Sequence, residues 1–143
     1  MALLTGFNKI KTAVFISGTG SNLKSLIQFS KLKKSPIVIE MIISNNAKSK
    51  GLQYSKVYKI KKKVFDFKNN SSEKKVIDEL KKNNINLICL AGFMKILSKN
   101  FIKSFKGQIL NIHPSLLPKY KGLNTHEKAI ENKDKYSGCT VHF

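Results

Sequence analysis

The chain has 143 residues, of which 41% are hydrophobic and 24% are charged. These proportions predict one folded domain over residues 1–143, with residues 1–10 as an N-terminal extension, and they argue against intrinsic disorder. The longest apolar runs have only the length of strands, and residues 1–7 lack the features of a signal peptide. We therefore expect a cytoplasmic protein with no membrane partner.

The net charge is +19, which by itself suggests nucleic acid or another anionic surface as a partner. All 27 basic residues are lysine, however, and proteins that read nucleic acids depend on arginine for bidentate contacts. The lysines are also scattered along the chain, which favours solvated surface charge. We therefore do not expect a nucleic acid partner, although the positive field would attract small anionic substrates.

Strands and helices alternate along the first half of the chain. A buried strand is followed by two glycines, and a proline ends the helix that comes next. The predicted elements are, in order, a strand over residues 12–17, a helix from Ser21 or Asn22, a strand over residues 37–43, a short helix and a weak strand over residues 56–60.

The same alternation continues in the second half. The predicted elements are a helix capped by Ser71 or Ser72, a strand over residues 87–91, a helix capped by Ser98, and a strand over residues 108–112. This order predicts an α/β domain whose mostly parallel sheet is flanked by helices. Ligands of such sheets bind beyond the carboxyl ends of the strands, which here means residues 18–22, 91–97 and 111–122.

Neither the cysteines nor the histidines have the spacing of a metal site. Cys89 and Cys139 each lie in an apolar, strand-like run, so we expect both thiols to be buried and inert. His113, His126 and His142 are far apart and lack a pattern of carboxylate partners. We therefore predict that the protein holds no metal.

Residues 17–22 read Ser-Gly-Thr-Gly-Ser-Asn and follow the first predicted strand. Glycines at such a place allow backbone N–H groups to approach an anion, and the N-terminus of the next helix adds partial positive charge. The run lacks the Gly-Lys-Ser/Thr ending of a P-loop, and Leu23 replaces the third glycine of a dinucleotide motif. The run therefore indicates either a phosphate site or a plain tight turn.

The run Asn-Ile-His-Pro-Ser-Leu-Leu-Pro over residues 111–118 is more specific. Residues two apart in an extended segment point to the same side, so Asn111 and His113 present their side chains together. Asparagine offers a neutral donor to an oxyanion, and histidine can exchange protons near neutral pH. This pair suits the attack of an amine on a carbonyl group.

Together these motifs resemble the formyltransferases that use 10-formyltetrahydrofolate, and specifically the branch that acts on glycinamide ribonucleotide. The resemblance extends over residues 11–143 and is carried by residues 15–23, 90–97 and 111–122, with Thr125 and His126 beyond them. It implies a Rossmann-like formyltransferase fold. It also implies transfer of a formyl group from 10-formyltetrahydrofolate to the amine of glycinamide ribonucleotide, a step of purine biosynthesis.

The resemblance also implies the site residues. Gly20, Ser21 and Asn22 match the contacts to the substrate phosphate, and the folate-binding positions are Met94, Lys95, Ile96, Leu97 and Asn111. Asn111 and His113 match the catalytic pair, which stabilises the oxyanion and moves the proton. A folate-contacting arginine expected near residues 68–69 has no arginine counterpart, and His126 and His142 match histidines expected to be structural.

The resemblance further implies an aspartate in a loop after the last strand, whereas the chain stops at Phe143. A carboxylate near His113 would favour the imidazolium, and Asp134, in a polar turn before that strand, is not an obvious replacement. We therefore expect the N-terminal part of the enzyme, with a domain incomplete at its C-terminus and little or no transferase activity. An exposed last strand would also favour association with other chains.

Two alternatives stay open. A formyltransferase acting on initiator methionyl-tRNA would usually have Arg-Trp-Arg-Gly after Leu-Leu-Pro, where residues 119–122 of this chain read Lys-Tyr-Lys-Gly. A non-catalytic fragment that binds folate or phosphate, or a lysine-rich domain associated with RNA, would show no turnover. Binding to RNA would weaken steeply with added salt.

Overall fold

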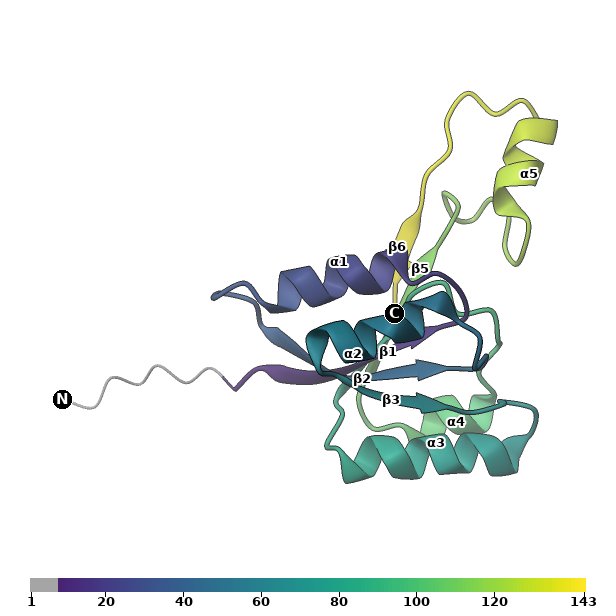
Figure 1. Ribbon diagram of the computed structural model, residues 1–143. Helices are drawn as coiled ribbons and strands as arrows, with labels where there is room; N and C mark the ends of the chain where they lie inside the picture. Colours follow the sequence, from purple (N-terminus) through teal and green to yellow (C-terminus); the bar gives the residue numbers. More distant parts are fainter. Residues whose placement is uncertain (1–7) are drawn as a thin grey trace.

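One six-stranded sheet forms the centre of the computed structural model, which describes residues 8–143 (Figure 1). The strands lie in the order β3-β2-β1-β4-β5-β6, and all neighbours are parallel except β5 and β6. The strands are β1 (Ile10–Ile16), β2 (Ile37–Ser44), β3 (Lys61–Val64), β4 (Leu87–Leu90), β5 (Gln108–His113) and β6 (Thr140–His142). This confirms the predicted Rossmann-like α/β fold.

Helices cover both faces of the sheet (Figure 1). The helices are α1 (Ser21–Ser30), the 3-10 helix η1 (Lys50–Gln53), α2 (Tyr54–Tyr58), α3 (Asn70–Lys82), α4 (Lys99–Ser104) and α5 (Thr125–Glu131). Of these, α5 lies apart from the sheet (Figure 1). No helix within residues 8–143 is long and apolar enough to cross a membrane. β1 begins at Ile10, and residues 1–7 of the expected N-terminal extension lie outside the described residues.

The central strand β1 contributes to two separate hydrophobic cores. Ala13 and Phe15 pack with the buried residues of α3 and α4, whereas Val14 and Ile16 pack with those of α1. All four side chains are 0% exposed. Successive side chains of a strand point to opposite faces, so a strand covered on both faces is apolar throughout. The continuous apolar run of β1 therefore fixes it in the middle of the sheet.

One predicted element was wrong. Residues 56–60, predicted as a weak strand, lie mainly in α2, and the strand follows as β3. Tyr54 and Tyr58 of α2 pack against the core on the α1 side, at helical spacing. β3 consists of three lysines and Val64, all exposed, and lies at the edge of the sheet. Lysines on an edge strand hinder pairing with other chains. Because they are charged, the strand also lacks the apolar pattern from which a strand is predicted.

The helix caps are partly as predicted. α3 is capped by Asn69, rather than by Ser71 or Ser72, in a reciprocal capping box with Ser72. The Asn69 side chain accepts from the Ser72 N–H at 2.9 Å, and the Ser72 hydroxyl accepts from the Asn69 N–H at 3.2 Å. Ser98 caps α4 as predicted, and its hydroxyl accepts from the Phe101 N–H at 3.0 Å. Two of the sequence-based helix starts therefore rest on side-chain caps.

Residues 114–139, here called the arm, project away from the sheet between β5 and β6 (Figure 1). At its base, Leu117 N–H donates to the Thr140 hydroxyl at 3.0 Å, and that hydroxyl donates to the Ser115 carbonyl at 2.8 Å. The chain then returns as β6, antiparallel to β5 and at the free edge of the sheet. Val141 of β6 is 61% exposed, as expected for an exposed last strand.

The two cysteines lie in different surroundings. Cys89 is buried in β4, as predicted, and burial raises the pKa of its thiol to about 11. Cys139 is exposed, which contradicts the prediction that both thiols are buried. The apolar run around Cys139 belongs to the end of the arm and to β6, which is an edge strand.

The cysteine environments predict a selective reaction with a thiol reagent. In the native chain at neutral pH, we expect one thiol, that of Cys139, to react promptly, because burial keeps Cys89 protonated and inaccessible. Denaturant should expose the second thiol. Counting the modified thiols by mass spectrometry, with Cys139→Ser as the control, checks this. Prompt modification of native Cys139→Ser would contradict the burial of Cys89.

Candidate functional site

The three segments selected from the sequence meet at one edge of the sheet. β1, β4 and β5 are parallel neighbours, with Phe15 opposite Leu90 and Leu90 opposite Asn111. The carboxyl ends of these strands therefore lie side by side, and the loops after them start at the same edge. The strand order reverses between β1 and β4, which is where ligands bind in open α/β sheets.

The glycine loop, residues 17–22, has the geometry of an anion site. Gly20 is the N-cap residue of α1 at φ 77°, in the left-handed region that favours glycine. No side chain within residues 8–143 caps α1, and its first turn carries no acidic residue. The N–H groups of this turn thus face the opening with the positive end of the helix dipole.

A close approach between two backbone segments requires Gly20. A Cβ atom on Gly20 would lie only 2.8 Å from the Cα of Gly51 in η1. The Gly51 N–H in turn donates to the Gly18 carbonyl at 3.0 Å. A hollow of about 250 Å³ lies beside this loop, lined by residues 17–22 and by Ala91, Gly92 and Met94. The glycine loop is therefore held against η1 and open toward the end of β4.

The segment after β4, residues 93–97, is anchored at both ends. The Met94 N–H donates to the Ser17 hydroxyl at 2.7 Å. At the other end, the buried Glu73 carboxylate accepts from the Ser98 N–H at 2.9 Å and from the Ser98 hydroxyl. Phe93 and Leu97, each next to one of the anchors, pack against the core on the α3 side. Met94 and Ile96 are 66% and 96% exposed, so they offer apolar surface to a ligand.

The predicted pair Asn111 and His113 lies at the carboxyl end of β5, where both residues are half-buried. Being two residues apart, they share the strand face of Ile109, which packs toward the α3 side. The Asn111 amide Nδ2 lies 3.2 Å from His142 Nε2 on the neighbouring strand β6. The sequence placed the pair correctly on one side of a strand but gave no partner for Asn111.

His113 is held by the arm. Its Nε2 lies 2.9 Å from the backbone carbonyl of Tyr120. A carbonyl oxygen only accepts, so Nε2 carries the proton and Nδ1 is the nitrogen that remains for proton exchange in the neutral ring. The arm thus selects the tautomer of His113.

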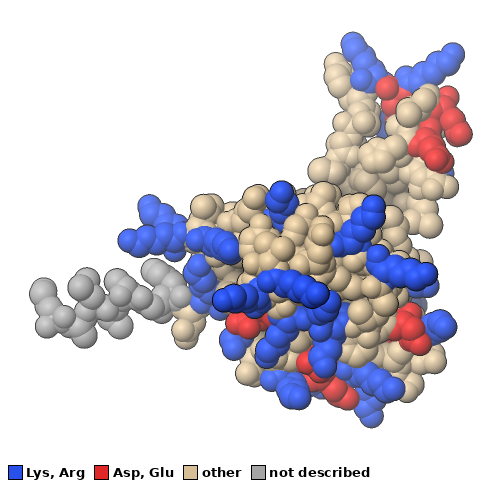
Figure 2. Space-filling model, viewed as in Figure 1, with Lys and Arg blue, Asp and Glu red and all other residues tan. Residues whose placement is uncertain are grey.

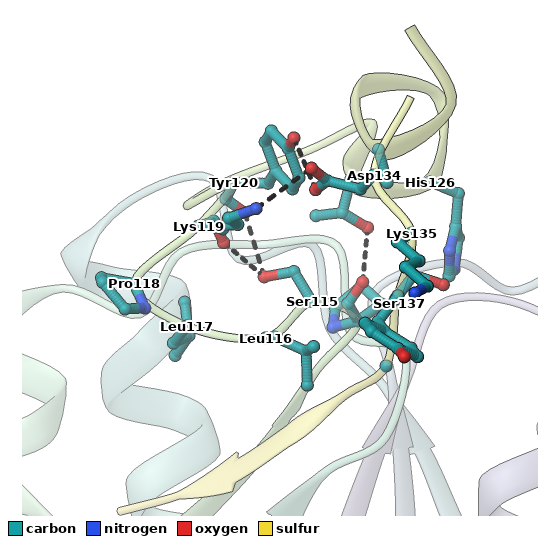
Figure 3. Close-up of a pocket in the computed structure, with 15 residues that line it drawn as sticks. Ser115, Leu116, Leu117, Pro118, Lys119, Tyr120, His126, Asp134, Lys135 and Ser137 are labelled. Atoms are coloured by element: carbon teal, nitrogen blue, oxygen red, sulfur yellow. Dashed lines mark hydrogen bonds and ion pairs between the residues drawn. The ribbon is translucent and has the colours of Figure 1, made fainter. Parts of the chain in front are cut away.

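Asp134 fixes the part of the arm that contacts His113. It accepts from Lys119 Nζ at 3.0 Å and from the Tyr120 hydroxyl at 2.8 Å, as Figure 3 shows. The Lys119 ammonium and the Tyr120 hydroxyl hold the pKa of Asp134 below its ordinary value. The hydrogen bond to Asp134 raises the pKa of Tyr120. Asp134 therefore binds Lys119 and Tyr120 rather than replacing the aspartate expected beside His113.

The arm also encloses a hollow of about 470 Å³ (Figure 3). It lies between α5, the loop after β5 and residues 134–138, and His126 lines it. This hollow is separate from the features described above: it is not lined by the glycine loop, by residues 93–97, or by Asn111 and His113. Within residues 8–143, no group of three or more His, Cys, Asp or Glu side chains is placed to hold a metal ion.

Sequence reasoning missed two features of this edge. One is the Ser17 hydroxyl, which contacts Asn45 after β2 and Met94 after β4. The other is the Tyr120 carbonyl on His113. Both contacts join residues from different elements, and a carbonyl exists at every position, so neither leaves a local signal in the sequence.

Comparisons with known proteins agree with this arrangement. Residues 10–143 match a family described as formyl transferase. The phosphoribosylglycinamide formyltransferase of Haemophilus influenzae is 47% identical over 137 residues, covering 93% of this chain and 65% of that protein. The human trifunctional purine biosynthetic protein adenosine-3 is 45% identical over 139 residues, covering 94% of this chain and 14% of that protein. This chain therefore spans only part of each relative's length.

The fold has solved counterparts as well. The crystal structure of phosphoribosylglycinamide formyltransferase from Brucella melitensis superposes with a TM-score of 0.89 at 38% sequence identity, covering 95% of this chain and 73% of that one. The structure from Anaplasma phagocytophilum gives a TM-score of 0.88 at 39% identity, covering 95% and 65% of the two chains.

The geometry of the glycine loop predicts a difference between two neighbouring glycines. Gly20→Ala should lower the free energy of unfolding by about 2 kcal/mol, because it combines a left-handed φ with a backbone contact. A Cβ atom on Gly18 would have no other atom within 4 Å. Gly18→Ala is therefore the matched control and should change the free energy of unfolding by less than about 0.5 kcal/mol. Urea unfolding measures both. Equal losses in the two variants would contradict the packing of Gly20 on Gly51.

Proposed function

The chain belongs to the formyl transferase family, and we propose that it carries the substrate sites for transfer of a formyl group to glycinamide ribonucleotide. The donor is 10-formyltetrahydrofolate, and the step belongs to purine biosynthesis in the cytoplasm. The proposal rests on one observation: three features lie at the same edge of the sheet. These are a glycine loop with backbone N–H groups at the start of α1, the segment of residues 93–97, and the Asn111–His113 pair. Phosphoribosylglycinamide formyltransferases are also among the relatives.

The glycine loop binds the phosphate of glycinamide ribonucleotide. The first-turn N–H groups of α1 and the side chains of Ser21 and Asn22 donate to its oxygens. Gly20 lets the chain pass close enough to η1 to keep these donors in place. The surrounding lysines, visible over much of the face in Figure 2, add a field that draws anions toward the protein.

The folate lies against residues 93–97. The exposed side chains of Met94 and Ile96 cover apolar parts of its ring system, and the backbone between the two anchors supplies polar contacts. Lys95 is exposed and places a cation beside a ligand that carries carboxylates. Asn111 borders the same edge of the sheet and contacts the folate from β5.

The reaction joins the glycinamide amine to the formyl carbon. As the new C–N bond forms, the π electrons of the formyl C=O bond move to its oxygen. The Asn111 amide and protonated His113 donate hydrogen bonds to the resulting oxyanion. The bond from carbon to the folate nitrogen then breaks, and that nitrogen receives the Nδ1 proton of His113. The emptied Nδ1 takes up the proton lost by the amine, which restores the imidazolium, while Nε2 keeps its proton on the Tyr120 carbonyl. Both ligands must sit at one edge for this transfer to occur.

The phosphate site is tested by a binding titration of the 143-residue chain with glycinamide ribonucleotide. Replacing Ser21 and Asn22 together by alanine should weaken binding roughly 10- to 100-fold, because hydrogen bonds to a charged phosphate contribute about 1.5–3 kcal/mol. Gln28→Ala, on the exposed surface of α1, is the control and should bind like the parent. Calorimetry measures all three. A parent chain with no measurable affinity, or a double variant with full affinity, would refute the assignment.

A further inference from the structure

The Ser17 hydroxyl joins the two substrate segments. It donates to Asn45 Oδ1 at 2.5 Å and accepts from the Met94 N–H at 2.7 Å. A serine hydroxyl has a single proton to donate, so the bond to Asn45 uses its donor and directs a lone pair toward Met94. Ser17 is half-buried and is the first residue of the glycine loop. One side chain therefore connects the loops that follow β1, β2 and β4.

We propose that Ser17 is a positioning residue that sets the separation between the phosphate site and the folate segment. This inference rests on the proposed function, because it concerns the same two ligands. It goes beyond that function by assigning a role to a residue that contacts neither ligand in the proposal. Ser17 acts through the backbone of Met94 on one side and through the glycine loop on the other.

The backbone of Ser17 strengthens this role. Its N–H donates to the Gly92 carbonyl at 3.2 Å, and its carbonyl accepts from the buried Ser49 hydroxyl at 2.8 Å. Ser49 is in turn 2.7 Å from the Ser44 hydroxyl at the end of β2. Backbone and side chain of Ser17 thus engage three neighbouring strand ends, so the starting point of the glycine loop is fixed in position.

The folate segment depends on this anchor more than the glycine loop does. Gly92 adopts φ 69°, in the left-handed region that favours glycine, and no atom lies within 4 Å of the place of a Cβ atom. Met94 itself is 66% exposed, and little packing holds it. Next to the packed side chain of Phe93, the hydrogen bond to Ser17 is therefore the contact that holds the Met94 backbone, whereas Glu73 and Ser98 fix the end of the segment. Formyl transfer needs the reacting atoms about 3–3.5 Å apart, so a loose segment would misplace the donor.

Substitution of the hydroxyl tests the proposal in the 143-residue chain. Ser17→Ala should speed hydrogen exchange of the Met94 amide at least tenfold and weaken both ligands, glycinamide ribonucleotide and a non-reactive folate analogue, about tenfold. Ser17→Thr keeps a hydroxyl and should restore slow exchange and most of both affinities. Ser71→Ala, an exposed serine on α3, is the matched control and should match the parent in every measurement.

Each result has a distinct meaning. Loss of both affinities in Ser17→Ala, rescued by Ser17→Thr at equal thermal stability, supports the positioning role. Unchanged Met94 exchange, or loss of one affinity alone, overturns it, and so does a threonine variant that behaves like alanine. A parent chain that binds neither ligand refutes the proposed function instead, so the two failures are told apart.

Discussion

The reversal of strand order between β1 and β4 decides where chemistry can take place in this chain. On either side of that point the loops run in opposite directions across the sheet, and the carboxyl ends of β1, β4 and β5 border the same opening. Apolar strands covered on both faces hold these ends at fixed separations. Residues far apart in sequence, such as Gly20 and Asn111, therefore lie at one edge of the sheet without forming a local motif together.

The catalytic pair in the proposal is held by two different parts of the chain. His142 on β6 contacts the Asn111 amide, and the Tyr120 carbonyl in the arm contacts His113. Asp134 accepts from the Tyr120 hydroxyl and also forms an ion pair with Lys119. This ion pair on the surface of the arm thereby influences the tautomer of the half-buried His113. The basic residues outside the site, such as the lysines of β3, protect an exposed sheet edge. The charge of the chain thus serves more than one purpose.

The sequence predicted the fold well, and the three segments that it selected meet at one sheet edge, because both depend on local patterns. The glycines after β1, the Asn-Ile-His run and the N-cap Ser98 can each be recognised from a few consecutive residues. The edge strand β3 was missed because its lysines lack an apolar face, and Cys139 was misjudged because burial at a sheet edge depends on neighbours. The links from Ser17 to Met94 and from His113 to Tyr120 are tertiary contacts, so no local pattern could predict them.

The central claim is that one sheet edge binds both ligands, and amide chemical-shift mapping of the 143-residue chain tests it most directly. With glycinamide ribonucleotide and a non-reactive folate analogue both present, we predict shifts concentrated in residues 17–22, 92–97 and 111–113. These residues border the reversal of strand order. Shifts centred instead on the hollow of the arm, at Leu116, Tyr136 and Gly138, would contradict the claim.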